Sequence, residues 1–174
     1  MNILKKLFSK SNLILYLIIL CLVLLDIGAK SLIENSMELG QSNSIIGGIL
    51  NFTFILNKGG AWGVFSEANA TVWLGVLSLI FAIIMLVCNA FFIKSKNLLY
   101  YFSFSLILAG TIGNMIDRFA INAVRDFIEV DFMSFPVFNV ADIFLVIGVI
   151  LFCIWYVISI FKSQPQKEEN MQKN

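Results

Sequence analysis

Four long apolar runs constrain this chain more than any other feature. They extend over about residues 13–31, 72–93, 98–116 and 142–161. A helix needs about 20 predominantly apolar residues to cross a hydrocarbon core of roughly 30 Å. Hydrophobic residues make up 59% of the sequence and charged residues 13%, whereas charged residues are about a quarter of a soluble domain. The sequence therefore predicts an integral membrane protein with four transmembrane helices.

The positions of the charged residues predict how these helices are oriented. One set of lysines falls at a single end of the predicted helices: Lys5, Lys6, Lys10, Lys94, Lys96, Lys162, Lys167 and Lys173. Most acidic residues fall at the opposite end. Because short cytoplasmic segments are enriched in Lys and Arg, both termini are expected to be cytoplasmic. The segments 32–71 and 117–141 are then expected to face outward.

The outward segments carry the pattern of a small sheet. Apolar and polar residues alternate along Leu50–Asn57, as in a strand with one apolar face, and Asn-Lys-Gly-Gly at 57–60 predicts a turn. The segment 129–138 alternates acidic and aromatic residues and is expected to pair with that strand. The predicted fold class is an all-α membrane protein with a small β element. Residues 1–161 are expected to form one domain and residues 162–174 a disordered cytoplasmic tail.

Several polar residues interrupt the outer parts of the apolar runs. Asp26 and Lys30 are four residues apart, so they lie on one helix face with the acid first, as a helical ion pair prefers. A rise of about 1.5 Å per residue places Asp26, Asn114 and Asp142 at one depth on three different helices. An unpaired ion costs a few kcal/mol there. We interpret the alignment as a common site, the alternative for Asp26 and Lys30 being an ion pair that orients the helix.

The absence of histidine restricts the hydrolytic chemistry open to this chain. Ser-His-Asp and Cys-His mechanisms and HExxH zinc sites are excluded. Two carboxylates among apolar neighbours remain, Asp126 and Asp142, and two carboxyl groups within a few Å share one proton and can activate water. The structural alternatives are a helix cap at Asp142 and an ion pair of Asp126 with Arg118 or Arg125. The sequence thus predicts an aspartic pair that needs no metal and no cofactor.

Five short blocks of residues, taken in order, carry a family pattern. They are Asp26-x-x-x-Lys30, Asn57-x-Gly59-x-Ala61-Trp62, Gly110-x-x-Gly113-Asn114-x-x-Asp117-Arg118, Asp126-Phe127-Ile128 and Phe138-Asn139-x-Ala141-Asp142. Together they resemble the bacterial lipoprotein signal peptidases, also called signal peptidase II. The resemblance covers the chain from the first predicted span to the fourth. It implies four transmembrane helices with an extracytoplasmic β-cradle and a small arm over the site.

The resemblance also implies a reaction and roles for individual residues. The reaction is removal of the signal peptide from diacylglyceryl-modified prolipoproteins, on the N-terminal side of the lipidated cysteine, at the outer face of the bacterial cytoplasmic membrane. Asp126 and Asp142 match the catalytic dyad. Substrate-binding or supporting positions are matched by Asp26, Lys30, Asn57, Gly59, Asn114, Arg118, Asn139 and Ala141. Expected partners are the prolipoprotein, membrane lipid and a globomycin-type inhibitor. No nucleic acid partner is expected, and a monomer would suffice.

Three sites depart from the family pattern. Ala109 replaces the first of two glycines, Gly60-Ala61-Trp62 replaces the usual Ala-Ala-Phe, and Arg125 precedes Asp126 where the family commonly has an apolar residue. A cation beside Asp126 would lower the pKa of that carboxyl and oppose proton sharing. Arg125 is therefore expected to point to solvent, to Glu129 or to Asp131.

Two other functional classes are open at this point. A Ser-Lys hydrolase would use Lys30 or Lys58 with Ser31 or Ser66 as nucleophile. A small transporter or assembly factor would use the intramembrane Asp and Lys as an ion path. Such a path would need polar residues across the whole membrane, whereas the inner two-thirds of the runs is almost purely apolar.

Overall fold

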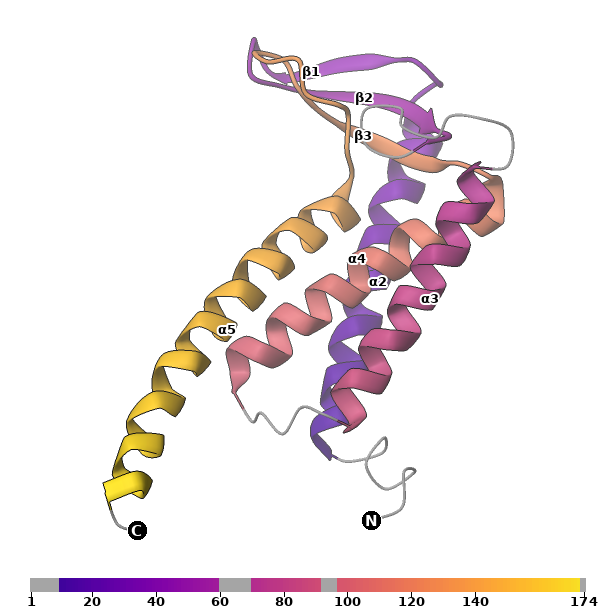
Figure 1. Cartoon of the computed structure of the whole chain (residues 1–174). Coiled ribbons are helices and arrows are strands. Elements are labelled where there is room, and N and C mark those ends of the chain that lie inside the picture. Colours follow the sequence, from indigo (N-terminus) through magenta and orange to yellow (C-terminus); the bar gives the residue numbers. More distant parts are fainter. Residues whose placement is uncertain (1–9, 60–69, 92–96, 173–174) are drawn as a thin grey trace.

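The computed structural model describes residues 10–59, 70–91 and 97–172, which form four long helices and a three-stranded sheet. The helices are α2 (Lys10–Ser36), α3 (Ala70–Phe91), α4 (Leu98–Ile121) and α5 (Val140–Gln172), and the strands are β1 (Ser42–Ile46), β2 (Leu50–Asn57) and β3 (Val124–Val130). The sheet covers one end of the helices, and α2 begins and α5 ends at the opposite end (Figure 1). All four helices contain a segment long and apolar enough to cross a membrane. The predicted fold class is confirmed.

Helix ends differ from the predicted spans where polar residues continue the helix. α4 extends five residues beyond 116 to Ile121 and stops at Asn122, whose left-handed φ of 53° ends the helix. α5 continues to Gln172, although residues 162–174 were predicted to be a disordered tail. Lys, Gln and Glu, which dominate that segment, are good helix formers, so a polar composition does not by itself end a helix.

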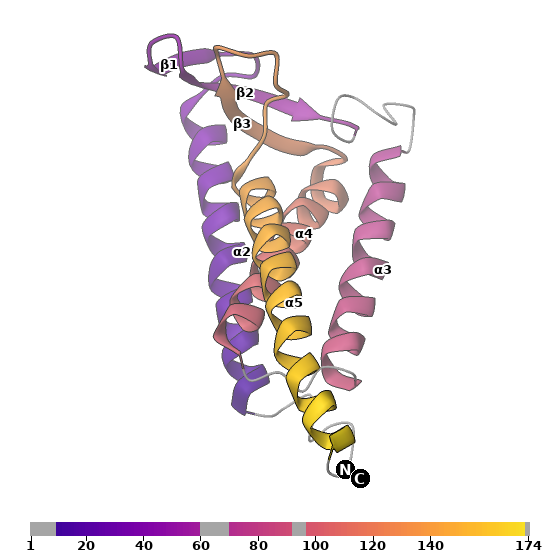
Figure 2. The ribbon, with the colours of Figure 1, turned by 60° about the vertical axis from the view of Figure 1, so that its left-hand side comes forward.

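α4 is the central helix of the bundle. It packs against α2, α3 and α5, and it is the most buried of the four spans. Figure 2 shows α2 and α3 on either side, with α4 behind α5. A side chain at Gly110 would collide with the backbone carbonyl of Ala141, and one at Gly148 would lie 2.8 Å from the backbone nitrogen of Ile107. Small residues therefore let α4 and α5 approach closely, where lipid supplies no hydrophobic drive.

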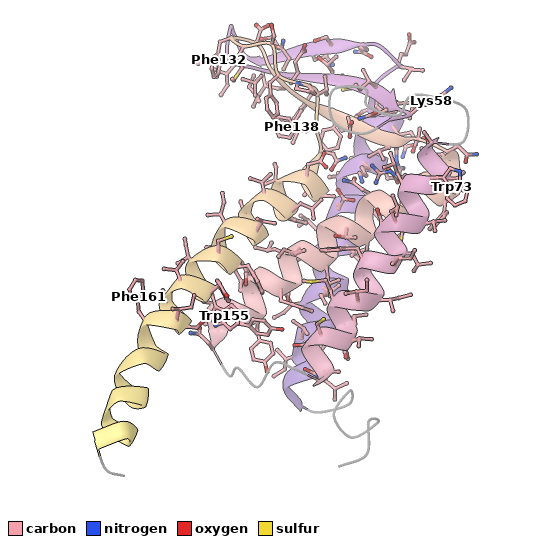
Figure 3. All side chains as sticks on the ribbon, in the orientation of Figure 1. Lys58, Trp73, Phe132, Phe138, Trp155 and Phe161 are labelled. Carbon is pink, nitrogen blue, oxygen red and sulfur yellow. The ribbon has the colours of Figure 1, made fainter. Side chains whose placement is uncertain are left out.

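The sheet is antiparallel, in the order β1-β2-β3. β2 has the bounds that its alternating pattern predicts. The predicted partner segment was only partly right, because β2 pairs with Val124–Val130 and not with a strand that starts at 129. Phe138, at the end of the predicted segment, bridges to Ile128 on β3, and it lies between the sheet and α5 (Figure 3).

A small apolar cluster fixes the sheet onto the end of α2. Ile33 of α2 and Met37, the residue that follows α2, pack with Phe54 of β2 and Phe127 of β3, and all four are buried. Burying each such side chain stabilises the fold by about 1.5–3 kcal/mol. Because successive strand residues point to opposite faces, anchoring Phe127 against α2 directs its neighbour Asp126 away from α2.

Candidate active site

The first turn of α5 is held by a reciprocal pair of hydrogen bonds. The Asn139 side-chain oxygen accepts from the Asp142 backbone N–H, and Oδ2 of Asp142 accepts from the Asn139 N–H, each at 3.0 Å. This is a capping box. The N–H of Ala141 donates to Oδ1 of Asp26 at 2.9 Å. The structural alternative for Asp142 is therefore correct in part: the capping residue is Asn139, and Asp142 completes the box three residues later.

Asp126 is buried and held by two amides. Asn57 donates to its Oδ2 at 2.9 Å and Asn139 donates to its Oδ1 at 2.7 Å, and the residue is 2% exposed. Burial, reinforced by the negative charge of Asp142, raises the pKa of Asp126 to about 7, while the two amide hydrogen bonds act in the opposite direction. Among the described residues, neither arginine suggested as its partner forms an ion pair with it.

Two asparagine amides connect the two carboxylates. Asn139 donates to Asn114 at 3.0 Å as well as to Asp126, and Asn114 donates to Oδ1 of Asp142 at 2.8 Å. Asn139 is fully buried and Asn114 is nearly so. The two amides in series thus link Asp126 to Asp142, so a carboxylate from the sheet and one from a helix start belong to a single hydrogen-bonded unit.

Asp26 and Lys30 support this unit from α2. Their ion pair is 2.8 Å long with both side chains fully buried, as their spacing predicted. Lys30 also donates to the side-chain oxygen of Asn114 at 2.9 Å. A side chain at Gly113 would collide with Oδ2 of Asp26, so this glycine lets α4 approach α2. Asp26, Asn114 and Asp142 lie in one cluster, as their common depth predicted.

The expected direction of Arg125 is wrong. Its guanidinium donates to Asp117 from Nη2 at 2.5 Å and to Glu34 from Nη1 at 2.7 Å, and Asp117 also accepts from its backbone N–H at 3.0 Å. Glu129, the partner once expected, instead accepts from Asn51 of β2. Strand alternation turns Arg125 to the α2 side, where the fully buried Asp117 needs a cation.

Asp117 is a residue that the predicted site left out. It accepts hydrogen bonds from Arg125 and lies 3.5 Å from Lys30. The sequence could have indicated this residue, because Asp117 lies within the family block that also contains Asn114 and Arg118.

Three further residues of the predicted site lie around the two carboxylates: Gly59, Ala141 and Arg118. Gly59 is buried and donates its N–H to Oδ1 of Asn57 at 3.0 Å, which fixes the amide that reaches Asp126. Ala141 is fully buried and contributes its backbone N–H to Asp26. Arg118 faces the cavity described next, and its Nε forms no hydrogen bond within the described part of the chain.

A cavity of about 530 Å³ lies beside the two carboxylates. Its polar floor is formed by Asn57, Asn114, Arg118, Asp126 and Asp142, and its apolar wall includes Phe135, Pro136, Phe138, Ile143, Val146 and Ile147. A second cavity of about 400 Å³ on the α3 side is walled by Leu74, Leu77 and Phe81 and shares Asn114, Arg118 and Asp142. An apolar wall beside two carboxylates can bind an apolar molecule and place one of its polar bonds next to the carboxyl groups.

The contacts do not favour the two other functional classes. The Lys30 ammonium is enclosed by Asp26 and Asn114, and the Ser31 hydroxyl accepts from Asn35, so these two do not form a Ser-Lys pair. Ser66 lies outside the described residues, as do Ala61, Trp62 and the expected arm. In the described part of the chain, the buried charged side chains all belong to the cluster at the sheet end: Asp26, Lys30, Asp117 and Asp126. An ion path would need such groups along the helices.

Comparisons with known proteins agree with this architecture. The family model described as signal peptidase (SPase) II matches residues 18–158. The lipoprotein signal peptidase of Lactobacillus gasseri is 37% identical over 150 residues, which are 86% of this chain and 96% of that protein. That of Lactiplantibacillus plantarum is 38% identical over 141 residues, 80% of this chain and 92% of that protein.

A solved bacterial membrane enzyme also has this fold. It superposes with a TM-score of 0.74 at 34% identity, covering 88% of this chain and 90% of that one. The family match extends from the first span to the fourth and includes every residue of the hydrogen-bonded cluster around Asn139. This chain is a multi-pass membrane protein that belongs to the signal peptidase II family of aspartic peptidases.

Proposed function

We propose that this chain removes the signal peptide from diacylglyceryl-modified prolipoproteins, with Asp126 and Asp142 as its catalytic pair. The observation that carries the proposal is the amide of Asn139, which binds Asp126 while its backbone binds Asp142 beside one cavity. Family membership supports the substrate class. We regard residues 1–161 as one peptidase domain that acts as a monomer.

The first chemical step is attack by water on the scissile carbonyl. Asp142, whose two oxygens accept hydrogen bonds from Asn114 and Asn139, is the base that takes a proton from the water. Asp126, with its pKa raised to about 7 by burial, carries the proton shared by the pair and delivers it to the carbonyl oxygen. The product of this step is a neutral tetrahedral diol.

The second step breaks the peptide bond. Asp126, now ionised, takes a proton from one hydroxyl of the diol, and Asp142 gives its proton to the leaving nitrogen. The C–N bond breaks to yield a carboxyl group and a free amine, and the shared proton is back on the pair. No other group has to titrate, because both carboxyls alternate as acid and base.

The cavity walls support a lipidated substrate. A signal peptide is an apolar helix and the diacylglyceryl group carries acyl chains, so both partition into the bilayer. The apolar wall along α5 and the second cavity beside α3 meet at Asn114, Arg118 and Asp142. A substrate that diffuses in the plane of the bilayer can therefore bring its scissile bond to the polar floor. The cut falls on the N-terminal side of the lipidated cysteine.

The distribution of lysines supports an outward-facing site in the bacterial cytoplasmic membrane. In intact cells, a membrane-impermeant maleimide should label Ser44→Cys on β1. It should not label Lys162→Cys, which lies at the end of the apolar span of α5 remote from the sheet; both residues are exposed. The reverse labelling pattern would contradict this orientation.

The catalytic assignment is tested with purified protein and a lipidated prolipoprotein. Asp126→Asn and Asp142→Asn should each lower kcat at least about 1000-fold. Asp131→Asn, an exposed acid in the turn after β3, is the matched control and should cleave normally. Wild-type cleavage by either dyad variant would reject the assignment.

Two further measurements test the substrate and the class of enzyme. A precursor whose cysteine lacks the diacylglyceryl group should be cleaved poorly, because it forfeits the burial of its acyl chains. Globomycin should inhibit the lipidated reaction. Equal cleavage of both precursors would reject the lipidated substrate class, and inhibition by serine-directed acylating reagents in place of globomycin would favour a Ser-Lys enzyme.

A further inference from the structure

A second charged cluster lies behind the proposed catalytic pair, on the side of α2. Asp26, Lys30 and Asp117 are fully buried there. The Lys30 ammonium lies 2.8 Å from Asp26 and 3.5 Å from Asp117, and it donates to Asn114 at 2.9 Å. An ammonium has three donors. Lys30 alone would therefore have to serve two buried carboxylates and the amide of Asn114.

Arg125 supplies the second cation of this cluster. Its Nε and Nη2 reach both oxygens of Asp117, at 3.2 and 2.5 Å. A two-pronged contact of this kind is stronger than a hydrogen bond between neutral groups and fixes the relative geometry of the two side chains. Nη1 is held at 2.7 Å by Glu34, which is 47% exposed and so can be solvated by water. With Arg125 present, the two buried carboxylates Asp26 and Asp117 are balanced by two cations.

The orientation of Asn114 depends on how Lys30 is shared. The Asn114 side-chain oxygen accepts from Lys30 and Asn139, which leaves its NH₂ group to donate to Asp142 at 2.8 Å. If Lys30 moved toward Asp117, the Asn114 side-chain oxygen would lose its charged donor, and the amide group would be free to rotate. After rotation, the Asn114 oxygen would face the Asp142 carboxylate, and the two oxygens would repel each other.

We propose that Arg125 is a positioning residue for the reaction: by neutralising Asp117 it leaves Lys30 to Asp26 and Asn114, and so keeps Asn114 oriented on Asp142. This inference rests on the proposed function. Arg125 contacts neither described cavity, and it points away from its neighbour Asp126. It therefore acts on the rate of the chemical step and not on substrate binding.

The test is a charge-balance rescue, measured on the full chain in detergent or liposomes. Arg125→Gln should lower kcat about tenfold while KM changes less than about twofold. Adding Asp117→Asn should return kcat to within about threefold of wild type, because the charge that draws Lys30 away is gone. The kcat of Arg125→Lys should lie between those of the wild type and of Arg125→Gln. The matched control, Lys162→Gln, removes an exposed cation at the far end of the apolar span of α5 and should have wild-type kinetics.

Folding is followed by thermal unfolding of each variant. Wild-type kcat in Arg125→Gln would overturn the inference, as would a folded Arg125→Gln protein whose kcat does not rise on adding Asp117→Asn. If Arg125→Gln alone does not fold, the double variant must fold and cleave; an inactive double variant overturns the inference. The dyad is tested separately, since wild-type cleavage by Asp126→Asn or Asp142→Asn rejects the catalytic assignment whatever the Arg125 variants do.

Discussion

The side-chain amide of Asn139 donates a hydrogen bond of 2.7 Å to Oδ1 of Asp126. The oxygen of the same side chain caps the first turn of α5. One fully buried residue therefore links the start of a membrane helix to a carboxylate on a strand. Helix stability and carboxylate placement depend on the same side chain, and different substitutions can separate the two.

Substituting Asn139 should affect stability and activity differently according to the new side chain. Asn139→Ala loses both the cap and the amide donor, so it should cost about 1 kcal/mol of stability for the cap and about 100-fold in kcat. Asn139→Ser keeps a capping oxygen but cannot reach Asp126, so it should restore the melting temperature without restoring kcat. Full activity in Asn139→Ser would show that the bond to Asp126 is dispensable.

The activity should fall on the alkaline side of neutrality. Burial raises the pKa of Asp126 to about 7, and the proposed first step uses its protonated form. kcat/KM should thus decrease about tenfold per pH unit above that value. Asn57→Ala removes a hydrogen bond that lowers this pKa, so the decrease should begin at higher pH. A profile that stays flat up to about pH 9 would contradict the role of Asp126.

The same carboxyl should make the folded protein less stable as pH rises. The pKa of Asp126 is about 7 in the folded protein against an ordinary 3.8, so the folded state binds its proton more tightly than the unfolded state. The free energy of unfolding therefore falls between these two values, by at most roughly 4 kcal/mol. Melting temperature should drop from pH 5 to pH 8 more steeply in wild type than in Asp126→Asn. Equal slopes would show that Asp126 does not titrate in this range.

Alanine substitution should have opposite effects on stability at two glycines of the membrane helices. A side chain at Gly113 would meet Oδ2 of Asp26 and lie 3.2 Å from Cβ of Ala141, so Gly113→Ala should cost about 1–3 kcal/mol and most of the activity. Nothing lies within 4 Å of the corresponding position at Gly28 on α2. Gly28→Ala should be neutral or stabilise by up to about 1 kcal/mol. Thermal unfolding of the two variants is the measurement, and equal effects would contradict the close packing of α4.

The Asp26–Lys30 pair should show strong coupling. Lys30→Met leaves buried carboxylates with one cation fewer and should cost about 3–5 kcal/mol, whereas Asp26→Asn combined with Lys30→Met should cost less than Lys30→Met alone. A double-mutant cycle on melting temperature measures this coupling. Additive effects would mean that water reaches the pair.

Much of the fold follows from local patterns in the sequence. Apolar runs of sufficient length predict the four membrane helices, because a helix is the structure that satisfies its own backbone in lipid. Alternation predicts β2 with its observed bounds, since one face of the strand is buried. The Asp26–Lys30 pair follows from helical spacing alone.

The environment of Arg125 does not follow from local pattern. The sequence places it next to Asp126, but strand pairing directs the two side chains to opposite sides. Its partners Asp117 and Glu34 come from α4 and α2. The residue pattern does not predict which face of the strand packs against which helix, so it does not predict the partners of Arg125.

The sequence by itself predicted the two carboxylates, most of the residues that surround them and their common level along the helices, and it excluded histidine chemistry, because composition, helical rise and residue type are properties of the chain. Only the tertiary structure decided that Asn139 joins Asp126 to Asp142, and that Arg125 balances Asp117 behind them. These contacts require the sheet to dock on α2 and the small residues of α4 to admit α5. Hydrogen bonds between segments so far apart depend on packing that no single segment specifies.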